Sequence, residues 1–178
     1  GQICMSTERI IVDQKIADDY VAKFVARAKP LPAGDPSAQA ACVLGPVISL
    51  KAADRLKGLL NDAIAKGAKL VAGGPGEGAL MPATVLDGVT PAMRIYHEET
   101  FGPIVSIIRA KDTEDAVRIA NDTEFGLSAA VFGQNVSRAL DVAKRVNAKM
   151  AELSKACPKG LVYEVPFDTT RFVNASIH

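Results

Sequence analysis

The sequence predicts an α/β fold: a largely parallel sheet with helices on both faces, followed by an irregular C-terminal tail. Two observations lead to this prediction. Short runs rich in β-branched residues alternate with helical stripes of apolar residues along most of the chain, separated by glycine and proline clusters. One of these runs, residues 104–109 (IVSIIR), indicates a strand that is covered on both faces.

The first half of the chain predicts a strand and two helices. Residues 7–12 (TERIIV) indicate the strand, and a four-residue spacing of apolar side chains indicates the helix after it, at Ile16, Tyr20, Phe24 and Ala28. A proline and glycine cluster ends this helix, and residues 33–46 form a polar connection. A second helical stripe ends at Gly67 and comprises Leu50, Ala53, Leu56, Leu60, Ala63 and Ile64.

The second half predicts four strands and two helices. The strands cover residues 68–74, 81–86, 104–109 and 128–133. Asp112 can cap a helix that carries Ala116, Val117 and Ala120, and the last helical stripe consists of Val136, Leu140, Ala143 and Val146. After Met150 no periodicity is sustained, and only residues 161–165 (LVYEV) resemble a strand. We therefore expect one folded domain over residues 1–150 and an unassigned tail over residues 151–178.

The composition favours a small-molecule substrate. Lys and Arg total 21 against 20 Asp and Glu, without a basic stripe or an acidic tail, so we expect neither nucleic acid nor a membrane as a partner. No apolar run approaches a membrane span of roughly 20 residues, and the first residues do not resemble a signal peptide, so the expected location is cytoplasmic. Three cysteines at irregular spacings suit reduced thiols better than disulfides or a metal site.

Cys4 is the candidate nucleophile. A lone cysteine is more often a small buried side chain, but the segment GQICMSTER resembles the nucleophile segment of the aldehyde dehydrogenase family, with Gln2, Cys4 and Arg9 in the motif positions. The resemblance implies that the Cys4 thiolate adds to an aldehyde, that hydride leaves the thiohemiacetal, and that water hydrolyses the resulting thioester. It also implies that the backbone N–H of Cys4 stabilises the oxyanion. Cys42 and Cys157 are expected to be inert thiols.

Two further segments match the same family in the same order. In HEETFGPIV, four residues match its E-x-F-G-P signature: Glu99, Phe101, Gly102 and Pro103. The resemblance implies that Glu99 accepts hydrogen bonds from the nicotinamide ribose and that Phe101 packs beside the nicotinamide of NAD or NADP. Residues 121–132 (NDTEFGLSAAVF) resemble a third family segment, which we interpret as structural.

The resemblance extends from Gly1 to about Met150 and is greatest to the salicylaldehyde and vanillin dehydrogenases, which implies an aromatic aldehyde substrate. Residues 1–150 are therefore expected to form an aldehyde dehydrogenase-like catalytic domain. The family's general-base Glu, oxyanion Asn and Gly-rich dinucleotide segment precede its nucleophile, so we expect this chain to be a fragment without the coenzyme-binding half. A homo-oligomer is expected for the full-length parent, although residues 151–178 depart from the family's oligomer-forming arm.

Two other hypotheses stay open. One is a folded but inactive module that binds partners, because general acid–base catalysis needs a base that this chain does not supply. The other is hydrolysis of esters or thioesters by Cys4 alone, which requires a lowered thiol pKa. Turnover by the isolated chain would count against the first, and equal reactivity of all three cysteines toward an alkylating reagent would count against the second.

Overall fold

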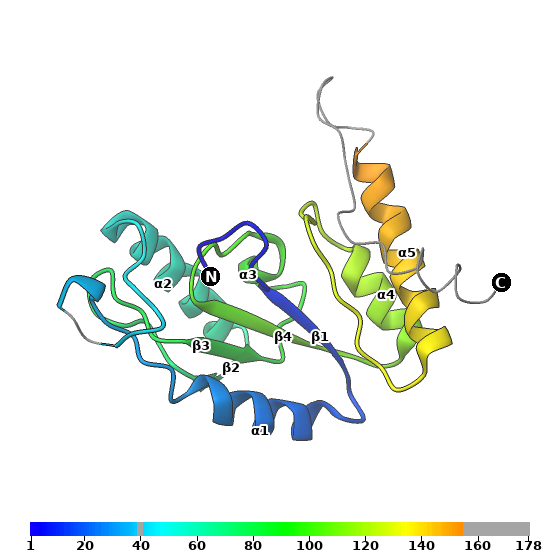
Figure 1. Ribbon diagram of the computed structural model, residues 1–178, viewed down its shortest axis with the longest axis horizontal. Coiled ribbons are helices and arrows are strands. Elements are labelled where there is room, and N and C mark those ends of the chain that lie inside the picture. The colour runs from blue at the N-terminus through cyan, green and yellow to red at the C-terminus, as the bar shows by residue number, and fades with distance from the viewer. Residues whose placement is uncertain (39–40, 155–178) are drawn as a thin grey trace. The chain divides into compact units, whose positions relative to one another are not determined.

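A four-stranded mixed sheet forms the centre of the first part of the chain, with the strand order β1-β4-β3-β2 (Figure 1). The computed structural model describes residues 1–38 and 41–154, with the backbone alone for residues 147–154. The chain divides into two units, one of residues 1–119 and one beginning at residue 120, and each is described by itself. The strands are β1 (Arg9–Asp13), β2 (Lys69–Ala72), β3 (Thr84–Asp87) and β4 (Ile104–Ala110).

Two of the three strand pairs are parallel, which confirms the predicted largely parallel sheet. β4 is an inner strand that runs parallel to both β1 and β3, with Arg9 opposite Ser106 and Thr84 opposite Ile104. β2 runs antiparallel to β3 at one edge. Because β1 and β4 are parallel neighbours, the segments that precede them lie at the same end of the sheet, where both strands begin.

Helices cover both faces of the sheet, as predicted (Figure 1). On one face, Val21 of the first helix packs in a hydrophobic core with Ile107 of β4. On the other face, Leu56 of the second helix belongs to a core that contains Ile108 of β4. Strand β4 is therefore buried on both sides, which is what its apolar sequence predicts. The helices concerned are α1 (Ala17–Ala28), α2 (Leu50–Ala65) and the short α3 (Arg94–His97).

Capping side chains explain where the helices begin and end. The hydroxyl of Ser49 accepts the backbone N–H of Ala52 at 3.1 Å and so caps α2. Gly67 follows the end of α2 with a φ of 101°, a conformation that favours glycine, so the predicted end is confirmed. The carboxylate of Asp112 accepts the backbone N–H of Asp115 at 2.9 Å, which confirms the predicted cap of α4 (Thr113–Asn121).

Several sequence predictions differ from the structure in detail. Residues 128–133 form no strand within the described chain, because an extended segment becomes a strand only when its backbone pairs with a neighbour. Helix α3 was not predicted. The helical stripes are shifted: Ile16, Leu50 and Ile64 are exposed, whereas Val21 and Leu59 are buried. Helix α3 is only one turn long, which is too short to give a periodic spacing of apolar residues in the sequence.

The second unit contains the helix α5 (Val136–Ser154). Its N-terminus is capped by Asn135, whose side chain accepts the backbone N–H of Arg138 at 3.0 Å. The predicted last helix is thus confirmed, and it continues four residues past Met150. The rest of the tail, including the strand predicted at 161–165, lies outside the described residues. Among the helices in the described residues, none is long and apolar enough to cross a membrane.

Candidate active site

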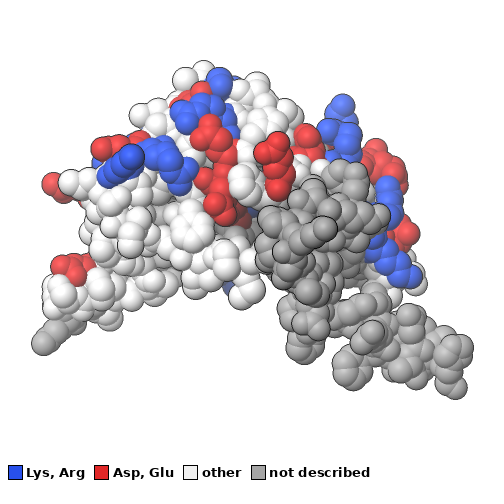
Figure 2. Space-filling view, turned by 90° about the horizontal axis from the view of Figure 1, so that it is seen from above, with Lys and Arg blue, Asp and Glu red and all other residues white. Residues whose placement is uncertain are grey.

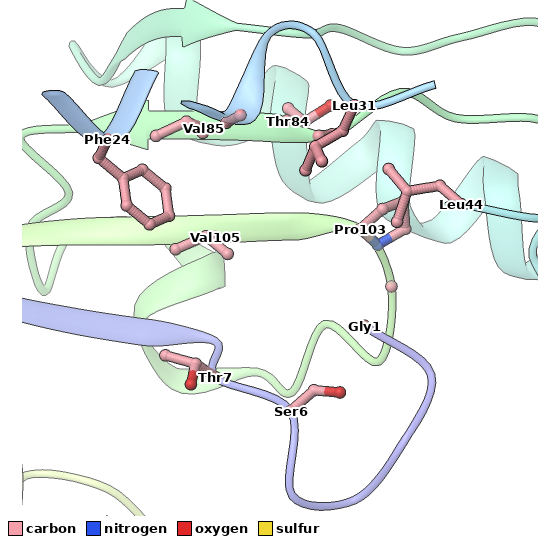
Figure 3. Close-up of a pocket in the computed structure, with 13 residues that line it drawn as sticks. Gly1, Ser6, Thr7, Phe24, Leu31, Leu44, Thr84, Val85, Pro103 and Val105 are labelled. Carbon is pink, nitrogen blue, oxygen red and sulfur yellow. The ribbon is translucent and has the colours of Figure 1, made fainter. Parts of the chain in front are cut away.

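The two motif segments meet at the end of the sheet where strands β1 and β4 begin. Residues 1–8 lead into β1 and residues 98–103 lead into β4, its parallel neighbour. The backbones approach so closely that a Cβ on Gly1 would collide with the carbonyl group of Gly102. Figure 3 shows Gly1 beside Pro103 at this point. A glycine at the first motif position is therefore required by contact with the second motif.

Cys4 lies in a turn that presents its side chain to solvent. The backbone N–H of Ser6 donates to the carbonyl of Ile3 at 2.8 Å and closes this turn around the cysteine. Cys4 is an exposed free thiol, and its neighbours Ile3 and Met5 are also exposed. An incoming electrophile can therefore reach the sulfur atom of Cys4.

Gln2 ties the Cys4 segment to the start of helix α2. Its side-chain Nε2 donates to the carbonyl of Pro46 at 3.1 Å, and its Oε1 accepts the backbone N–H of Ile48 at 2.9 Å. Ile48 directly precedes Ser49, the N-cap of α2. The glutamine of the nucleophile motif therefore anchors the turn that carries Cys4.

The backbone of residues 99–101 is held from two sides. The carboxylate of Glu8 accepts the N–H of Thr100 and the N–H of Phe101, both at 2.7 Å. The guanidinium of Arg55, on α2, donates to the carbonyl of Glu99 at 2.9 Å and to the carbonyl of Thr100. Both contacts involve a charged group, so they are stronger than neutral hydrogen bonds.

Phe101 adopts an unusual backbone conformation between these contacts. Its φ is 48°, and within residues 1–38 and 41–154 it is the single non-glycine residue with a positive φ. This region is unfavourable for a residue with a bulky side chain, so the surrounding hydrogen bonds must maintain it. The side chain of Phe101 is 41% exposed, which leaves part of its ring available for contact.

Glu98 and Glu99 are adjacent, but their carboxylates have different surroundings. Arg94 donates to both carboxylate oxygens of Glu98, at 2.8 and 3.1 Å, and holds the pKa of that carboxyl below its usual value. The carboxylate of Glu99 is exposed and has no hydrogen-bond partner among the described residues. Only Glu99 therefore has both oxygens free to accept hydrogen bonds from a ligand.

The structure brings the predicted Cys4 segment together with the segment of Glu99 and Phe101, and it adds two residues that sequence reasoning missed. Those residues are Glu8 and Arg55. Glu8 lies inside the quoted nucleophile motif, but its partners are 92 and 93 residues away along the chain. No local pattern indicates such a pairing.

A cavity in the first unit lies beside the two motif segments. It has a volume of about 260 Å³ and lies between α1 and the sheet, beside Gly1 and Pro103. Figure 3 shows Phe24 of α1 and Val105 of β4 on its walls. Its lining includes none of the predicted site residues Cys4, Glu99 and Phe101. The cavity is mostly apolar and carries no group suited to acid–base chemistry.

Charged side chains of both signs are interspersed on the face shown in Figure 2, without a broad area of one sign.

Within the described residues there is no group of three or more His, Cys, Asp or Glu side chains that could hold a metal ion. Of the described cysteines, Cys4 is an exposed free thiol and Cys42 is a half-buried free thiol. Cys157 lies outside the described residues.

The third motif forms part of the second unit. The side chain of Asn121 donates to the carbonyl of Arg145, on α5, at 3.4 Å. Phe125, Leu127 and Phe132 are exposed within this segment. The motif's asparagine thus contacts α5 within the second unit.

A comparison with protein families identifies the chain. The model described as "Aldehyde dehydrogenase family" matches residues 1–168, nearly the whole sequence. The chain belongs to the aldehyde dehydrogenase family. The predicted family resemblance is therefore confirmed, and the match includes all three motif segments.

Similar family members act on aromatic aldehydes, as their names state. A salicylaldehyde dehydrogenase of Pseudomonas putida is 60% identical over 142 residues, which are 80% of this chain and 29% of that protein. A vanillin dehydrogenase of Pseudomonas fluorescens is 49% identical over 154 residues, which are 86% of this chain and 32% of that protein. The predicted likeness to this branch of the family is confirmed, and the chain spans about a third of the length of these relatives.

Solved structures of the family share the fold. A salicylaldehyde dehydrogenase from Pseudomonas putida G7, complexed with salicylaldehyde, matches with a TM-score of 0.79 and 54% identity over 82% of this chain and 30% of its own. An NADP-dependent glyceraldehyde-3-phosphate dehydrogenase from Bacillus halodurans, complexed with NADP, matches with a TM-score of 0.78 and 38% identity, with the same coverage. An NAD-dependent benzaldehyde dehydrogenase from Corynebacterium glutamicum has a TM-score of 0.75 and 42% identity over 81% of this chain and 31% of its own.

Proposed function

We propose that the full-length protein oxidises an aromatic aldehyde to its carboxylic acid with NAD+ or NADP+, and that Cys4 is the nucleophile. One observation carries the proposal: the segment of Cys4 and the segment of Glu99 and Phe101 are held against each other at the end of the sheet where β1 and β4 begin. Hydride transfer requires an aldehyde carbon and an acceptor ring at a fixed separation and orientation. The contact between the two segments supplies such a frame.

The role we assign to Cys4 is the formation of a covalent intermediate. Its exposed thiol loses a proton to solvent, the sulfur adds to the carbonyl carbon, and the C=O π electrons become a negative charge on oxygen. The backbone N–H of Cys4 is the donor we assign to that oxygen. When the oxyanion re-forms the C=O bond, the hydrogen on the same carbon leaves with its electron pair and a thioester remains on sulfur. Water then breaks the C–S bond, releasing the acid and the free thiol.

Glu99 and Phe101 fit the nicotinamide end of the coenzyme, which when bound supplies the hydride acceptor. The carboxylate of Glu99 is exposed and has no hydrogen-bond partner among the described residues, so it can accept from two adjacent ribose hydroxyls. The half-exposed ring of Phe101 offers a flat apolar surface against which the nicotinamide ring can pack. These two residues bind and orient the ring, and they move no proton in this scheme.

The substrate class rests on the relatives. The proteins named above act on salicylaldehyde, vanillin or benzaldehyde according to their names. An aromatic aldehyde also suits a site whose flanking side chains at positions 3 and 5 are apolar. We therefore propose an uncharged or weakly charged aromatic aldehyde rather than a phosphorylated one.

The test is reduced-coenzyme formation by the full-length protein with salicylaldehyde, benzaldehyde and acetaldehyde, and with NAD+ and NADP+ in turn. We expect turnover with the aromatic aldehydes, no turnover by Cys4→Ser, and unchanged turnover by Cys42→Ser, which removes a half-buried thiol. Turnover that survives in Cys4→Ser would exclude Cys4 as the nucleophile. Activity with acetaldehyde alone would exclude the aromatic substrate class.

A second candidate is a folded module that binds a partner without catalysis. It is favoured by one observation, that the chain corresponds to about 30% of the solved salicylaldehyde dehydrogenase. Catalysis by this family needs groups beyond the matched part, so residues 1–178 expressed alone are expected to fold without turnover. Turnover by residues 1–178 alone would exclude this second candidate.

A further inference from the structure

We propose that Glu8 is a positioning residue for the coenzyme. Its carboxylate fixes the backbone of Thr100 and Phe101, and through that backbone it sets the place of the Glu99 carboxylate and the Phe101 ring. The inference rests on the proposed function, because it assumes that Glu99 and Phe101 bind the nicotinamide ribose and ring. It adds a residue from the nucleophile segment to the coenzyme site.

Both oxygens of the Glu8 carboxylate accept hydrogen bonds from this backbone. One oxygen of Glu8 accepts the N–H of Thr100 and the other accepts the N–H of Phe101, each at 2.7 Å. The backbone of Glu8 is itself anchored, since its carbonyl accepts the N–H of Ser106 at 2.8 Å. We call the two hydrogen bonds accepted by the Glu8 carboxylate the clamp. Glu8 is therefore bonded both to strand β4, through its backbone, and to the segment that precedes β4, through the clamp.

Residues 98–103, here called the coenzyme loop, need such a clamp because of the conformation of Phe101. Phe101 has a φ of 48°, which a phenylalanine rarely adopts without outside support. Arg55 holds the carbonyls of Glu99 and Thr100, while Glu8 holds the N–H groups of Thr100 and Phe101. If the N–H groups were released, Phe101 would relax toward a negative φ and its ring would move away from the position shown here.

The clamp also links the nucleophile to the coenzyme. Glu8 is four residues after Cys4 in the same segment, and Gln2 anchors the beginning of that segment to Pro46 and Ile48. A shift of the coenzyme loop therefore cannot occur independently of the segment that carries the sulfur. This coupling would keep the aldehyde carbon and the nicotinamide ring in register.

The experiment compares three variants of the full-length protein. Glu8→Gln keeps one acceptor oxygen but turns the other atom into an N–H donor that faces an N–H group. Glu8→Asp keeps both acceptor oxygens with a shorter reach. Glu77→Gln is the matched control, because Glu77 is exposed and its substitution makes the same change in charge away from the site. The readouts are amide hydrogen exchange in residues 98–103 and 104–110, binding of NADH and NADPH by fluorescence, and the alkylation rate of Cys4.

In Glu8→Gln we expect amide exchange in residues 98–103 to become about tenfold faster, and reduced-coenzyme binding to weaken about tenfold, because a charge-assisted hydrogen bond is lost. Exchange in residues 104–110 and alkylation of Cys4 should not change. Glu8→Asp should restore part of the binding, and Glu77→Gln should behave as wild type. A merely structural role for Glu8 would alter exchange and stability but not the affinity for the coenzyme.

The outcomes separate this inference from the proposed function. If wild type oxidises aldehydes and Glu8→Gln binds reduced coenzyme as tightly as wild type, the positioning role is wrong while the proposed function stands. If wild type binds the coenzyme without oxidising an aldehyde, the proposed chemistry is wrong and the positioning role is judged on binding alone. A wild type that binds neither coenzyme overturns both. Where Glu8→Gln does not fold, wild-type coenzyme affinity in Glu8→Asp together with faster amide exchange in residues 98–103 overturns the inference.

Discussion

The contact between Gly102 and Leu56 leads to a stability prediction that depends directly on the placement of the coenzyme loop. A Cβ added at Gly102 would collide with Cδ1 of Leu56 and lie 3.1 Å from its Cδ2. Leu56 is fully buried in the core between α2 and the sheet, so its side chain has little room to move aside. Overpacking of this kind costs 1–3 kcal/mol, and we expect Gly102→Ala to lower the free energy of unfolding by about 2 kcal/mol.

A second substitution isolates the steric origin of this cost. Leu56→Ala alone should destabilise the protein by about 3 kcal/mol, because it removes buried methyl groups and leaves a cavity. In the double variant the new methyl at position 102 occupies part of that cavity. The double variant should therefore lose about 3 kcal/mol rather than the sum of about 5 kcal/mol.

The assay is equilibrium unfolding in denaturant for the four proteins of this cycle, with Gly58→Ala as the control. Gly58 lies inside α2, and a Cβ there would meet nothing within 4 Å, so alanine should stabilise the helix by up to about 1 kcal/mol. Additive losses in the cycle, or a Gly102→Ala variant as stable as wild type, would refute the close contact between the E-x-F-G-P segment and α2.

Three further predictions test other parts of the structure. Arg109→Met should lower the free energy of unfolding by about 2 kcal/mol, because it leaves the buried carboxylate of Asp87 without the guanidinium that contacts both its oxygens. Denaturant titration checks this, and Asp87→Leu in the same background should recover part of the loss. The hydrogen bonds from Arg94 hold the folded-state pKa of Glu98 below its usual value, so the contribution of this carboxylate to stability is present at neutral pH and is lost as the pH falls through that lowered pKa. Glu98→Gln should thus be less stable than wild type by about 0.5 kcal/mol at neutral pH and equally stable in acid, since the ion pair with Arg94 is exposed; a pH series of Tm values with a constant difference would contradict this. Phe101→Asn should stay within about 1 kcal/mol of wild-type stability, because asparagine tolerates a positive φ, yet it should bind reduced coenzyme about tenfold more weakly. Unchanged affinity in fluorescence titrations would exclude a role for the Phe101 ring.

Local sequence signals were sufficient for most of the elements in the described chain. The cap at Asp112, the glycine at position 67 and the apolar run of β4 each depend on nearby residues, and each was confirmed. The strand predicted at residues 128–133 failed because alternation and β-branched content describe a propensity, while a strand also needs a partner. Non-local pairing is not visible in a single sequence.

The same distinction applies to the site. Cys4, Glu99 and Phe101 were chosen because their segments resemble a family, and their roles stay proposals. That the two segments touch follows from β1 and β4 being neighbours, which the sequence did not show. Glu8 was overlooked because nothing around it indicates that its carboxylate meets two N–H groups more than 90 residues away.

The most direct test of the account asks which atom carries the acyl group. The full-length protein is mixed with salicylaldehyde and NAD+ or NADP+, quenched in acid during the first turnover, digested and analysed by mass spectrometry. The account predicts a salicyloyl thioester on the peptide that contains Cys4 and on neither Cys42 nor Cys157, with no adduct in Cys4→Ser. An acyl group on another residue, or turnover without any adduct on Cys4 together with activity in Cys4→Ser, would contradict it.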